Sequence, residues 1–295
     1  MTTMILLVGE QPAPNLLPLR HYNPTQVALV YTSLTQTRAE RLAAVIGRKA
    51  QQPMCKTDAF RVADIQTALE TYIQGQGWAG DELLFNLTGG TKTMALAAYE
   101  VARRMEAAAF YYQTEANQSL IHPYRFKQGK LIADDPVPIT ETLTLDDYLK
   151  LYVGSYTPNL LPKDPFEEMV YQVLSKSGLP DFEVMPSMHM IGLSGNVEVD
   201  MLARRGNQVA VFEIKRQAGK KGIDQLNGVT DQRTLGTYTR KILVSAAPLE
   251  PNNLELAKAY RIKVVTLPSG LGTALTDGDV QQLVRAVGES LEPKR

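Results

Sequence analysis

The chain has 295 residues, 44% of them hydrophobic, and lysine plus arginine equal aspartate plus glutamate at 31 each. This length predicts a folded protein of two domains, and the neutral total still allows a local basic patch to bind nucleic acid. The single cysteine, Cys55, excludes a disulfide framework within the chain, and no apolar run reaches the ~18 residues that cross a bilayer, so we expect a cytoplasmic protein without a membrane segment.

Short apolar runs alternate with helical patterns in the first half of the chain. The runs predict buried strands at 4–9, 27–33, 83–88 and 108–113. The segments between them place apolar residues at helical spacing over 38–50, 62–73 and 91–105. This alternation predicts a parallel sheet with right-handed crossovers, whose ligands bind at the carboxyl ends of the strands.

Three polar segments follow predicted strands and are expected to meet at that end of the sheet. They are the proline-stiffened loop 8–18, the strand end Tyr31-Thr32-Ser33, and the loop in NLTGGTKTMALAAYE (86–100), which opens a helix. Glycines and free amides at a helix start attract anions, and Lys92 adds positive charge. The spacing is not that of a P-loop, and a helix cap without a ligand remains the alternative.

A composition change at YVGSYTPNLLPKDP (152–165), with three prolines and a glycine, predicts the domain boundary. We therefore expect a first domain at 1–152, a linker at 153–165 and a second domain at 166–295. The second domain is predicted to be α/β, with an opening helix at 166–178, strands at 182–191, 196–204, 208–216, 240–246 and 262–268, and further helices near 221–232, 252–261 and 279–291.

The alternating pattern of NVEVDMLARRGNQVAVFEIKRQ (196–217) predicts a hairpin with Gly206-Asn207 as its turn. In that register Asp200 faces Glu213 and Glu198 faces Lys215. Opposed like charges destabilise a sheet, but a divalent cation between them removes the penalty, and carboxylates are ligands that magnesium prefers. The alternative is a solvated face on which Lys215 pairs with Glu198.

Asp200 followed by Glu213-Ile214-Lys215, after an acidic helix, resembles the PD-(D/E)xK nuclease superfamily. The resemblance implies a restriction-endonuclease-like domain in which Asp200, Glu213 and the Ile214 carbonyl hold Mg²⁺ or Mn²⁺ while Lys215 assists the attacking water. It also implies a metal-site glutamate on the opening helix, at Glu167 or alternatively Glu168. Gln225 corresponds to a substrate-facing glutamine of some members.

The segments GEQPAPN (9–15) and TGGTK (88–92) resemble those of CARF domains, the Rossmann-like sensor modules of CRISPR-associated effectors, and in particular the CARF–nuclease effectors of the Can2/Card type. This resemblance covers nearly the whole chain. It implies a homodimer that binds one cyclic oligoadenylate, with cyclic tetra-adenylate favoured, across its twofold axis. The implied contact residues are Gln11, Pro12, Asn15, Thr32, Ser33, Thr88, Gly89, Gly90, Thr91 and Lys92.

Together the two resemblances imply a cyclic-oligoadenylate-activated, metal-dependent endonuclease of type III CRISPR antiviral defence that cleaves DNA, RNA or both. A regulator that binds the ring without cutting, and an enzyme that degrades the ring itself, are the alternatives. A basic track for the substrate is expected near the site, formed by Arg204, Arg205, Lys215, Arg216, Lys220 and Lys221.

Overall fold

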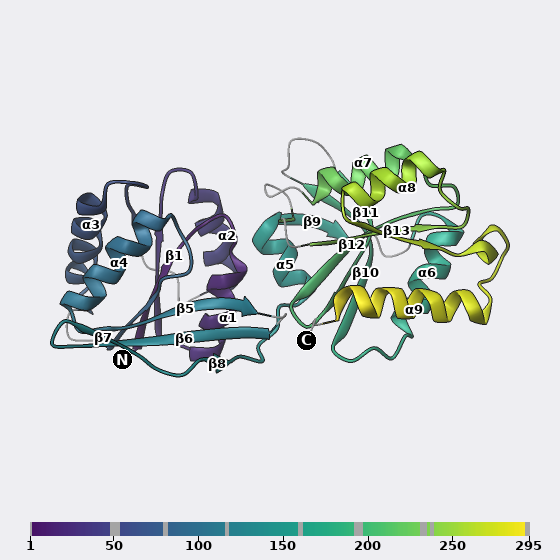
Figure 1. Cartoon of the computed structure of the whole chain (residues 1–295). Helices are drawn as coiled ribbons and strands as arrows, with labels where there is room; N and C mark the ends of the chain where they lie inside the picture. Colours follow the sequence, from purple (N-terminus) through teal and green to yellow (C-terminus); the bar gives the residue numbers. More distant parts are fainter. Residues whose placement is uncertain are drawn as a thin grey trace. The chain divides into compact units, whose positions relative to one another are not determined.

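The computed structural model (Figure 1) describes residues 2–47, 54–78, 82–115, 118–158, 162–191, 197–230, 235–236 and 239–292. It divides into two compact units, Met1–Thr142 and Leu143–Arg295, each with its own sheet. In the described part of the chain, no helix is long and apolar enough to span a membrane.

The sheet of the first unit has the strand order β3-β2-β1-β4-β5-β6-β7, and β8 pairs with β6. Neighbouring strands from β3 to β5 are parallel, whereas β5, β6 and β7 pair antiparallel. The expected parallel sheet is therefore confirmed at its centre and extended by a hairpin that the sequence did not predict. Its strands are β1 (Thr2–Leu7), β2 (Gln26–Tyr31), β3 (Cys55–Lys56), β4 (Glu82–Asn86), β5 (Ala108–Glu115), β6 (Gln118–Lys127), β7 (Lys130–Ala133) and β8 (Val137–Pro138).

Helices cover both faces of this sheet: α1 (Ala13–Tyr22) and α2 (Gln36–Ile46) on one, α3 (Val62–Gly75) and α4 (Lys92–Arg104) on the other (Figure 1). Alternate strand residues such as Ile5, Leu7 and Phe85 pack with α3 and α4 in one buried cluster. The strand order reverses between β1 and β4, so the carboxyl ends of these two strands form the switch point where ligands bind in such folds.

The prediction that residues 8–18 form a loop is wrong from Ala13 onward, where α1 begins. Pro12 is the N-cap residue and Pro14 lies in the first turn, a place where a missing N–H costs nothing. Leu16 and Leu17 then bury the helix against the sheet. Proline density, which predicts a loop, here marks a helix start.

The second unit is built on a sheet with the order β14-β13-β12-β11-β10-β9. Strands β12 to β14 are parallel and β9 to β12 antiparallel. Helices α6 and α9 pack on one face, with the core residues Phe166, Val170 and Leu283, while α7 and α8 lie on the other (Figure 1). The elements are α5 (Leu145–Tyr152), β9 (Ser155–Pro158), α6 (Pro165–Ser175), β10 (Phe182–Ile191), β11 (Val197–Arg205), β12 (Gln208–Lys215), α7 (Lys220–Val229), β13 (Arg240–Ser245), α8 (Pro251–Ala259), β14 (Ile262–Thr266), the 3₁₀ turn η3 (Pro268–Leu271) and α9 (Asp277–Leu291).

The boundary between the units falls after Thr142, ten residues before the expected one. Helix α5 starts with a capping box between Thr144 and Asp147 and packs on β9, β10 and β11, so it belongs to the second unit. The expected linker 153–165 contains β9, which pairs with β10 at the edge of the sheet; residues 159–161 of it lie outside the described part. Pro158 ends this edge strand, a position where its missing N–H costs no ladder bond.

Candidate functional site

The candidate reaction centre lies where β11 and β12 separate. The two strands pair from Arg205–Gln208 to Met201–Phe212, which confirms the expected turn at Gly206-Asn207. The pairing of the two strands does not extend to the predicted pairs Asp200–Glu213 and Glu198–Lys215. Instead, the Asp200 carboxylate accepts the backbone N–H of Ile214 at 2.8 Å. The Asp200 side chain thus takes the place of a ladder bond and ties the middle of β11 to the end of β12.

Three carboxylates surround the ammonium group of Lys215. Its Nζ lies 2.7 Å from Asp200 Oδ2, 3.4 Å from Glu213 Oε1 and 3.6 Å from Glu167 Oε1. Asp200, Glu213 and Glu167 are 7%, 2% and 7% exposed, whereas the Lys215 side chain is 42% exposed. The structure thus brings together all four predicted side chains, from α6, β11 and β12, with the lysine open to solvent.

Between the two glutamates proposed for α6, Glu167 is the one in this cluster. Its Oε1 faces Lys215, and its Oε2 accepts the backbone N–H of Lys163 at 3.1 Å. Glu168 is partly exposed and accepts a hydrogen bond from Gln172 one turn later on the same helix. Asp164 is the N-cap of this helix, and its carboxylate accepts the N–H of Phe166 and so caps the turn that carries Glu167.

Burial and the nearby charge of Asp200 raise the affinity of Glu167 and Glu213 for protons. Desolvation first, and then the charge of Asp200, raise the pKa of Glu213 to about 7. The same two causes, in the same order, raise the pKa of Glu167. Burial works against the charged form of Lys215, but the hydrogen bond to Asp200 and the charges of Asp200 and the glutamates outweigh it, and its pKa is raised. The lysine is therefore a permanent cation beside Glu213, whose carboxyl group exchanges its proton near neutral pH.

The donor set fits a hard divalent cation. All three acids offer oxygen ligands, the type that Mg²⁺ and Mn²⁺ prefer, and they carry more negative charge than one lysine offsets. Among the described residues, however, no three acidic, histidine or cysteine side chains stand in metal-binding geometry. The ammonium of Lys215 lies among the acids, so binding a metal requires the lysine to move aside.

The predicted alternative, an ion pair between Lys215 and Glu198, is wrong. Glu198 pairs with Lys163 and accepts a hydrogen bond from Ser187. Gln225 donates to the backbone carbonyl of Glu198 at 3.3 Å, so in this structure it supports β11. Lys163 therefore frees Lys215 for the acidic cluster, a role that sequence spacing did not indicate.

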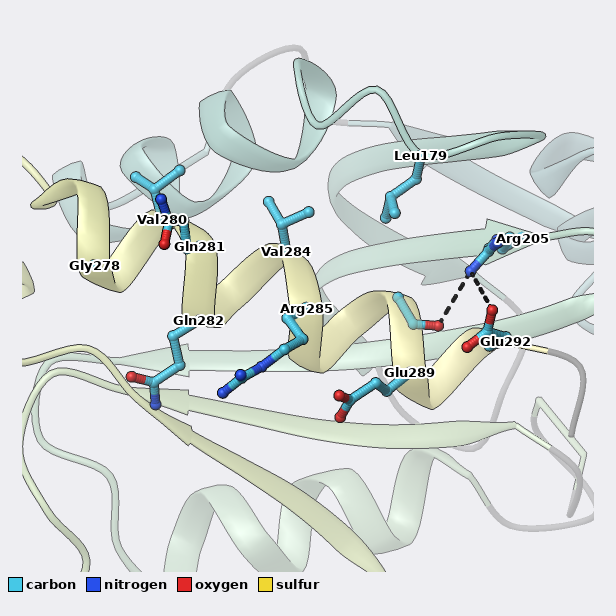
Figure 2. Close-up of a pocket in the computed structure, with 11 residues that line it drawn as sticks. Leu179, Arg205, Gly278, Val280, Gln281, Gln282, Val284, Arg285, Glu289 and Glu292 are labelled. Carbon is cyan, nitrogen blue, oxygen red and sulfur yellow. Dashed lines mark hydrogen bonds and ion pairs between the residues drawn. The ribbon is translucent and has the colours of Figure 1, made fainter.

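The expected basic track is wrong for two of its members. Arg204 pairs with Asp181 and Glu183, and Arg205 pairs with Glu292 and donates to the Gly288 carbonyl (Figure 2). Both lie beside the hairpin turn, at the opposite end of β11 from Asp200. Lys220 and Lys221, at the start of α7, are exposed.

A groove of about 730 Å³ runs along α9, and its lining includes Arg205, Val284 and Arg285 (Figure 2). Leu179 and Val280 add apolar surface to it. Glu167, Asp200, Glu213 and Lys215 do not line this groove, so the groove and the candidate reaction centre lie at different places on the unit.

In the first unit, glycines allow the backbones of the loops after β1 and β4 to come into close contact. A Cβ on Gly89 would lie 1.8 Å from the carbonyl oxygen of Leu7, and a Cβ on Gly9 would lie 2.9 Å from the Gly90 nitrogen. Gly90 itself has φ +70°, a backbone conformation that residues with a side chain rarely adopt. Thr91 then caps α4 by accepting the Met94 N–H at 3.2 Å. The predicted glycine–threonine loop is therefore a close-packed backbone turn at the switch point.

Buried amides hold these loops in place. Asn15 is fully buried; its Nδ2 donates to Leu7 O at 3.0 Å, and its Oδ1 accepts from Asn86 Nδ2 at 3.1 Å. Asn86 also accepts the Thr88 N–H at 3.0 Å, and Thr88 Oγ1 accepts the Tyr112 N–H. Asn15 and Thr88, predicted as ligand contacts, therefore position the loops. Asn86 was missed, although an asparagine that ends an apolar strand is itself a signal.

The other predicted contact residues differ in their access to a ligand. Ser33 and Lys92 are exposed, and Gln11 is half-buried. Pro12 and Thr32 are buried, and the Thr32 hydroxyl contacts that of Thr35 at 3.3 Å. Ser33 and Lys92 are therefore the predicted contact residues most open to a ligand, and the backbone around Gly89 and Gly90 is partly exposed beside them.

Comparison with known proteins identifies the first unit. Residues 3–148 match the model of the Card1 CARF domain. Can2 from Sulfobacillus thermosulfidooxidans, solved in complex with cyclic tetra-adenylate, has a TM-score of 0.74 at 17% identity over 98% of this chain and 97% of its own. Protein VC1899 from Vibrio cholerae has a TM-score of 0.74 at 13% identity, covering 99% of both chains.

A type III CRISPR defence DNA nuclease activated by cyclic oligoadenylate has a TM-score of 0.64 at 17% identity, over 96% of this chain and 51% of its own. No curated protein matches the sequence. The structural likenesses show a shared fold across both units, and the family model matches the first unit alone. The first unit is therefore a CARF domain of the Card1 type, and the two units together share the fold of Can2.

Proposed function

We propose that this protein is an endonuclease activated by a cyclic oligoadenylate and dependent on a divalent metal. The observation that carries the proposal is the convergence of Glu167, Asp200, Glu213 and Lys215 in a chain whose other unit is a CARF domain. Three buried acids around one lysine stabilise a fold poorly, because each loses hydration and repels the others. Such an arrangement is typical of a site that binds a cation and a phosphate.

The activator is proposed to bind at the carboxyl end of the first sheet, with cyclic tetra-adenylate as the favoured ring because Can2 was solved with it. Ser33, Lys92 and the amides near Gly89 offer hydroxyl, charge and hydrogen-bond donors to its phosphates. Two copies of this cradle facing each other suit a ring with repeated phosphates.

Exposed apolar side chains near the cradle support a homodimer. Leu34 is 85% exposed in the loop after β2, Phe60 is 70% exposed in the loop after β3, and Leu96 is 61% exposed on α4. The Ala59 carbonyl, beside Phe60, accepts hydrogen bonds from Thr91 and Thr93, so the Phe60 loop is fixed to the start of α4. A second copy that covers these side chains would bring two cradles together.

At the reaction centre, Asp200, Glu213 and the Ile214 carbonyl are proposed to hold Mg²⁺ or Mn²⁺, with Glu167 assisting. The metal, when bound, supplies Lewis-acid activation of water and neutralises charge on a scissile phosphate of DNA or RNA. Lys215, charged and open to solvent, is suited to bind a nonbridging phosphate oxygen and stabilise the charge that develops there. Glu213, with its pKa raised to about 7, can exchange a proton with solvent near neutral pH.

A short connection offers a route from the ring to the cutting site. At the last turn of α1, Arg20 donates to Thr142 O at 2.8 Å and His21 lies 3.2 Å from Glu141. On the other side of the boundary, the Leu143 N–H donates to Asn207 in the turn of the β11–β12 hairpin. Because α1 starts at the cradle, we propose that ring binding shifts this helix and, through these bonds, the hairpin that carries Asp200 and Glu213.

One experiment separates this function from its alternatives. Purified protein is incubated with labelled cyclic tetra-adenylate, Mn²⁺, and single- and double-stranded DNA and RNA, and both ring and polymer are followed. The proposal predicts polymer cleavage that requires ring and metal together. Loss of the ring without cleavage would identify a ring-degrading enzyme, and binding without either reaction would identify a regulator; each result would contradict the proposal.

A further inference from the structure

Arg216 links the reaction centre to a turn elsewhere in the second unit. It follows Lys215 directly, and its Nη1 donates to the carbonyl oxygens of three consecutive residues, at 2.8 Å to Gly270, 3.2 Å to Leu271 and 3.4 Å to Gly272. On another side its Nε lies 3.8 Å from Oδ1 of Asp164. One guanidinium therefore joins the end of β12 to the turn η3 and to the N-cap residue of α6.

The turn that Arg216 holds presses on α6 where Glu167 lies. A Cβ on Gly270 would lie 2.2 Å from Cε2 of Phe166, so the turn touches that ring with its bare backbone. Phe166 is fully buried and precedes Glu167. The turn is also held by α9, because the Ser269 N–H donates to the Asp279 carboxylate at 2.9 Å. The position of α6 thus depends on a stack running from α9 through η3 to Phe166.

We propose that Arg216 is a positioning residue that sets the distance between the Glu167 carboxylate on α6 and the Glu213 and Lys215 side chains on β12. The inference rests on the proposed nuclease function and adds a residue to its machinery. Glu167 is the only one of the three clustered acids that comes from a helix outside the β11–β12 hairpin. Without Arg216, α6 keeps its hydrophobic contacts and the Glu167–Lys215 ion pair, but it loses the pair between Asp164 and Arg216 and the support of the turn η3, so Glu167 can drift from the metal-binding acids.

The competing role for Arg216 is direct binding of a substrate phosphate, as its place beside Lys215 would allow. The contacts of Arg216 favour positioning, since Nη1 and Nε both face groups of the protein. A lysine at this position would keep the charge but would lack the planar set of donors that reaches the turn and Asp164 at once. The two roles therefore differ in what Arg216→Lys preserves.

The test compares wild type, Arg216→Ala and Arg216→Lys as full-length proteins, with Arg205→Ala as the matched control. Arg205 also donates to a backbone carbonyl and pairs with an acid in the same unit, but beside the hairpin turn. Bound Mn²⁺ is measured from the loss of the free-ion electron paramagnetic resonance signal. Affinity for a DNA and an RNA oligonucleotide is measured in EDTA over a range of salt concentrations, and thermal unfolding reports folding.

We expect both Arg216 variants to bind Mn²⁺ about tenfold more weakly than wild type, the range for residues that orient metal ligands, with Arg205→Ala unchanged. Oligonucleotide affinity and its salt dependence should stay at the wild-type level. Wild-type Mn²⁺ affinity in Arg216→Lys would overturn the proposal, as would weaker oligonucleotide binding with a salt slope reduced by roughly 0.7–0.9, the signature of one lost phosphate contact.

The result remains decisive if Arg216→Ala fails to fold, because Arg216→Lys then carries the comparison. Failure of the two proposals can be told apart. If wild type cleaves nucleic acid and the Arg216 variants bind Mn²⁺ normally, only the positioning role is wrong. If wild type binds Mn²⁺ in an Arg216-dependent way but cleaves nothing, the nuclease function is wrong; a wild type that binds no Mn²⁺ overturns both.

Discussion

The ammonium of Lys215 lies 2.7 Å from Oδ2 of Asp200, and the same oxygen accepts the backbone N–H of Ile214 at 2.8 Å. One carboxylate thus holds the lysine and also closes the gap where the ladder between β11 and β12 ends. The lysine offsets only part of the charge of Asp200, Glu213 and Glu167. The cluster is therefore left with excess negative charge, which a divalent cation would balance.

The raised pKa of Glu213 predicts a pH-dependent stability. Its folded-state pKa of about 7 exceeds its ordinary value of 4.5, so between these values the folded protein binds more protons than the unfolded chain. The free energy of unfolding in EDTA should therefore fall as pH rises from about 5 to about 8, by on the order of 2–3 kcal/mol from this residue. Glu213→Gln should flatten that fall and be more stable than wild type at the alkaline end.

Denaturant unfolding at a series of pH values measures this effect. Glu289→Gln, at an exposed position in the same unit, is the control for the loss of one carboxylate. If the free energy of unfolding depends on pH equally in wild type and Glu213→Gln, the pKa of Glu213 is not raised and the account of this residue is contradicted.

Reversing the charge at Lys92 should weaken activator binding. Lys92 is exposed at the start of α4, beside the glycine turn, and makes no ion pair with any described residue, so the substitution removes a phosphate partner without opening the core. Lys92→Glu is expected to raise the Kd for cyclic tetra-adenylate about tenfold or more, as measured by calorimetry. Lys130→Glu, in β7 and also exposed, should bind the ring as wild type does. Equal affinities in the two variants would remove Lys92 from the ring site.

Loss of Arg20 should separate ring binding from cleavage. Its guanidinium bonds the Thr142 carbonyl at the boundary, away from the start of α1 at the cradle. Arg20→Ala is expected to keep the Kd for the ring within about threefold and to reduce ring-stimulated cleavage about fivefold or more, within the range of allosteric couplings. Arg125→Ala, which breaks an exposed pair with Asp134 in the same unit, is the control. Full stimulation of Arg20→Ala would show that the signal takes another route.

The hairpin and its acids could be predicted because alternation and a glycine–asparagine turn set the register locally, and Asp200, Glu213 and Lys215 follow from counting. Glu167 came from a resemblance, since nothing local tells a helix residue which strand it will face. The Lys163–Glu198 and Arg216–Gly270 contacts join segments far apart in sequence, and no spacing rule encodes them.

In the first unit, the central strands and three helices were evident from their apolar periodicity, whereas α1 was hidden by prolines that also suit a helix start. The domain boundary was misplaced for a similar reason. Proline density marked the edge strand β9, while the chain crosses between the units at Thr142 and Leu143, in a segment without a turn signal of its own.

The measurement that tests the central claim most directly is cleavage by wild type and Asp200→Asn, each with and without cyclic tetra-adenylate and Mn²⁺, alongside ring affinity for both proteins. The substitution keeps the size of the side chain and removes the charge that holds Lys215 and the metal. We predict that wild type cuts only with ring and metal together, and that Asp200→Asn binds the ring normally but cuts more than about a hundredfold more slowly. Cleavage by Asp200→Asn at the wild-type rate would contradict the account.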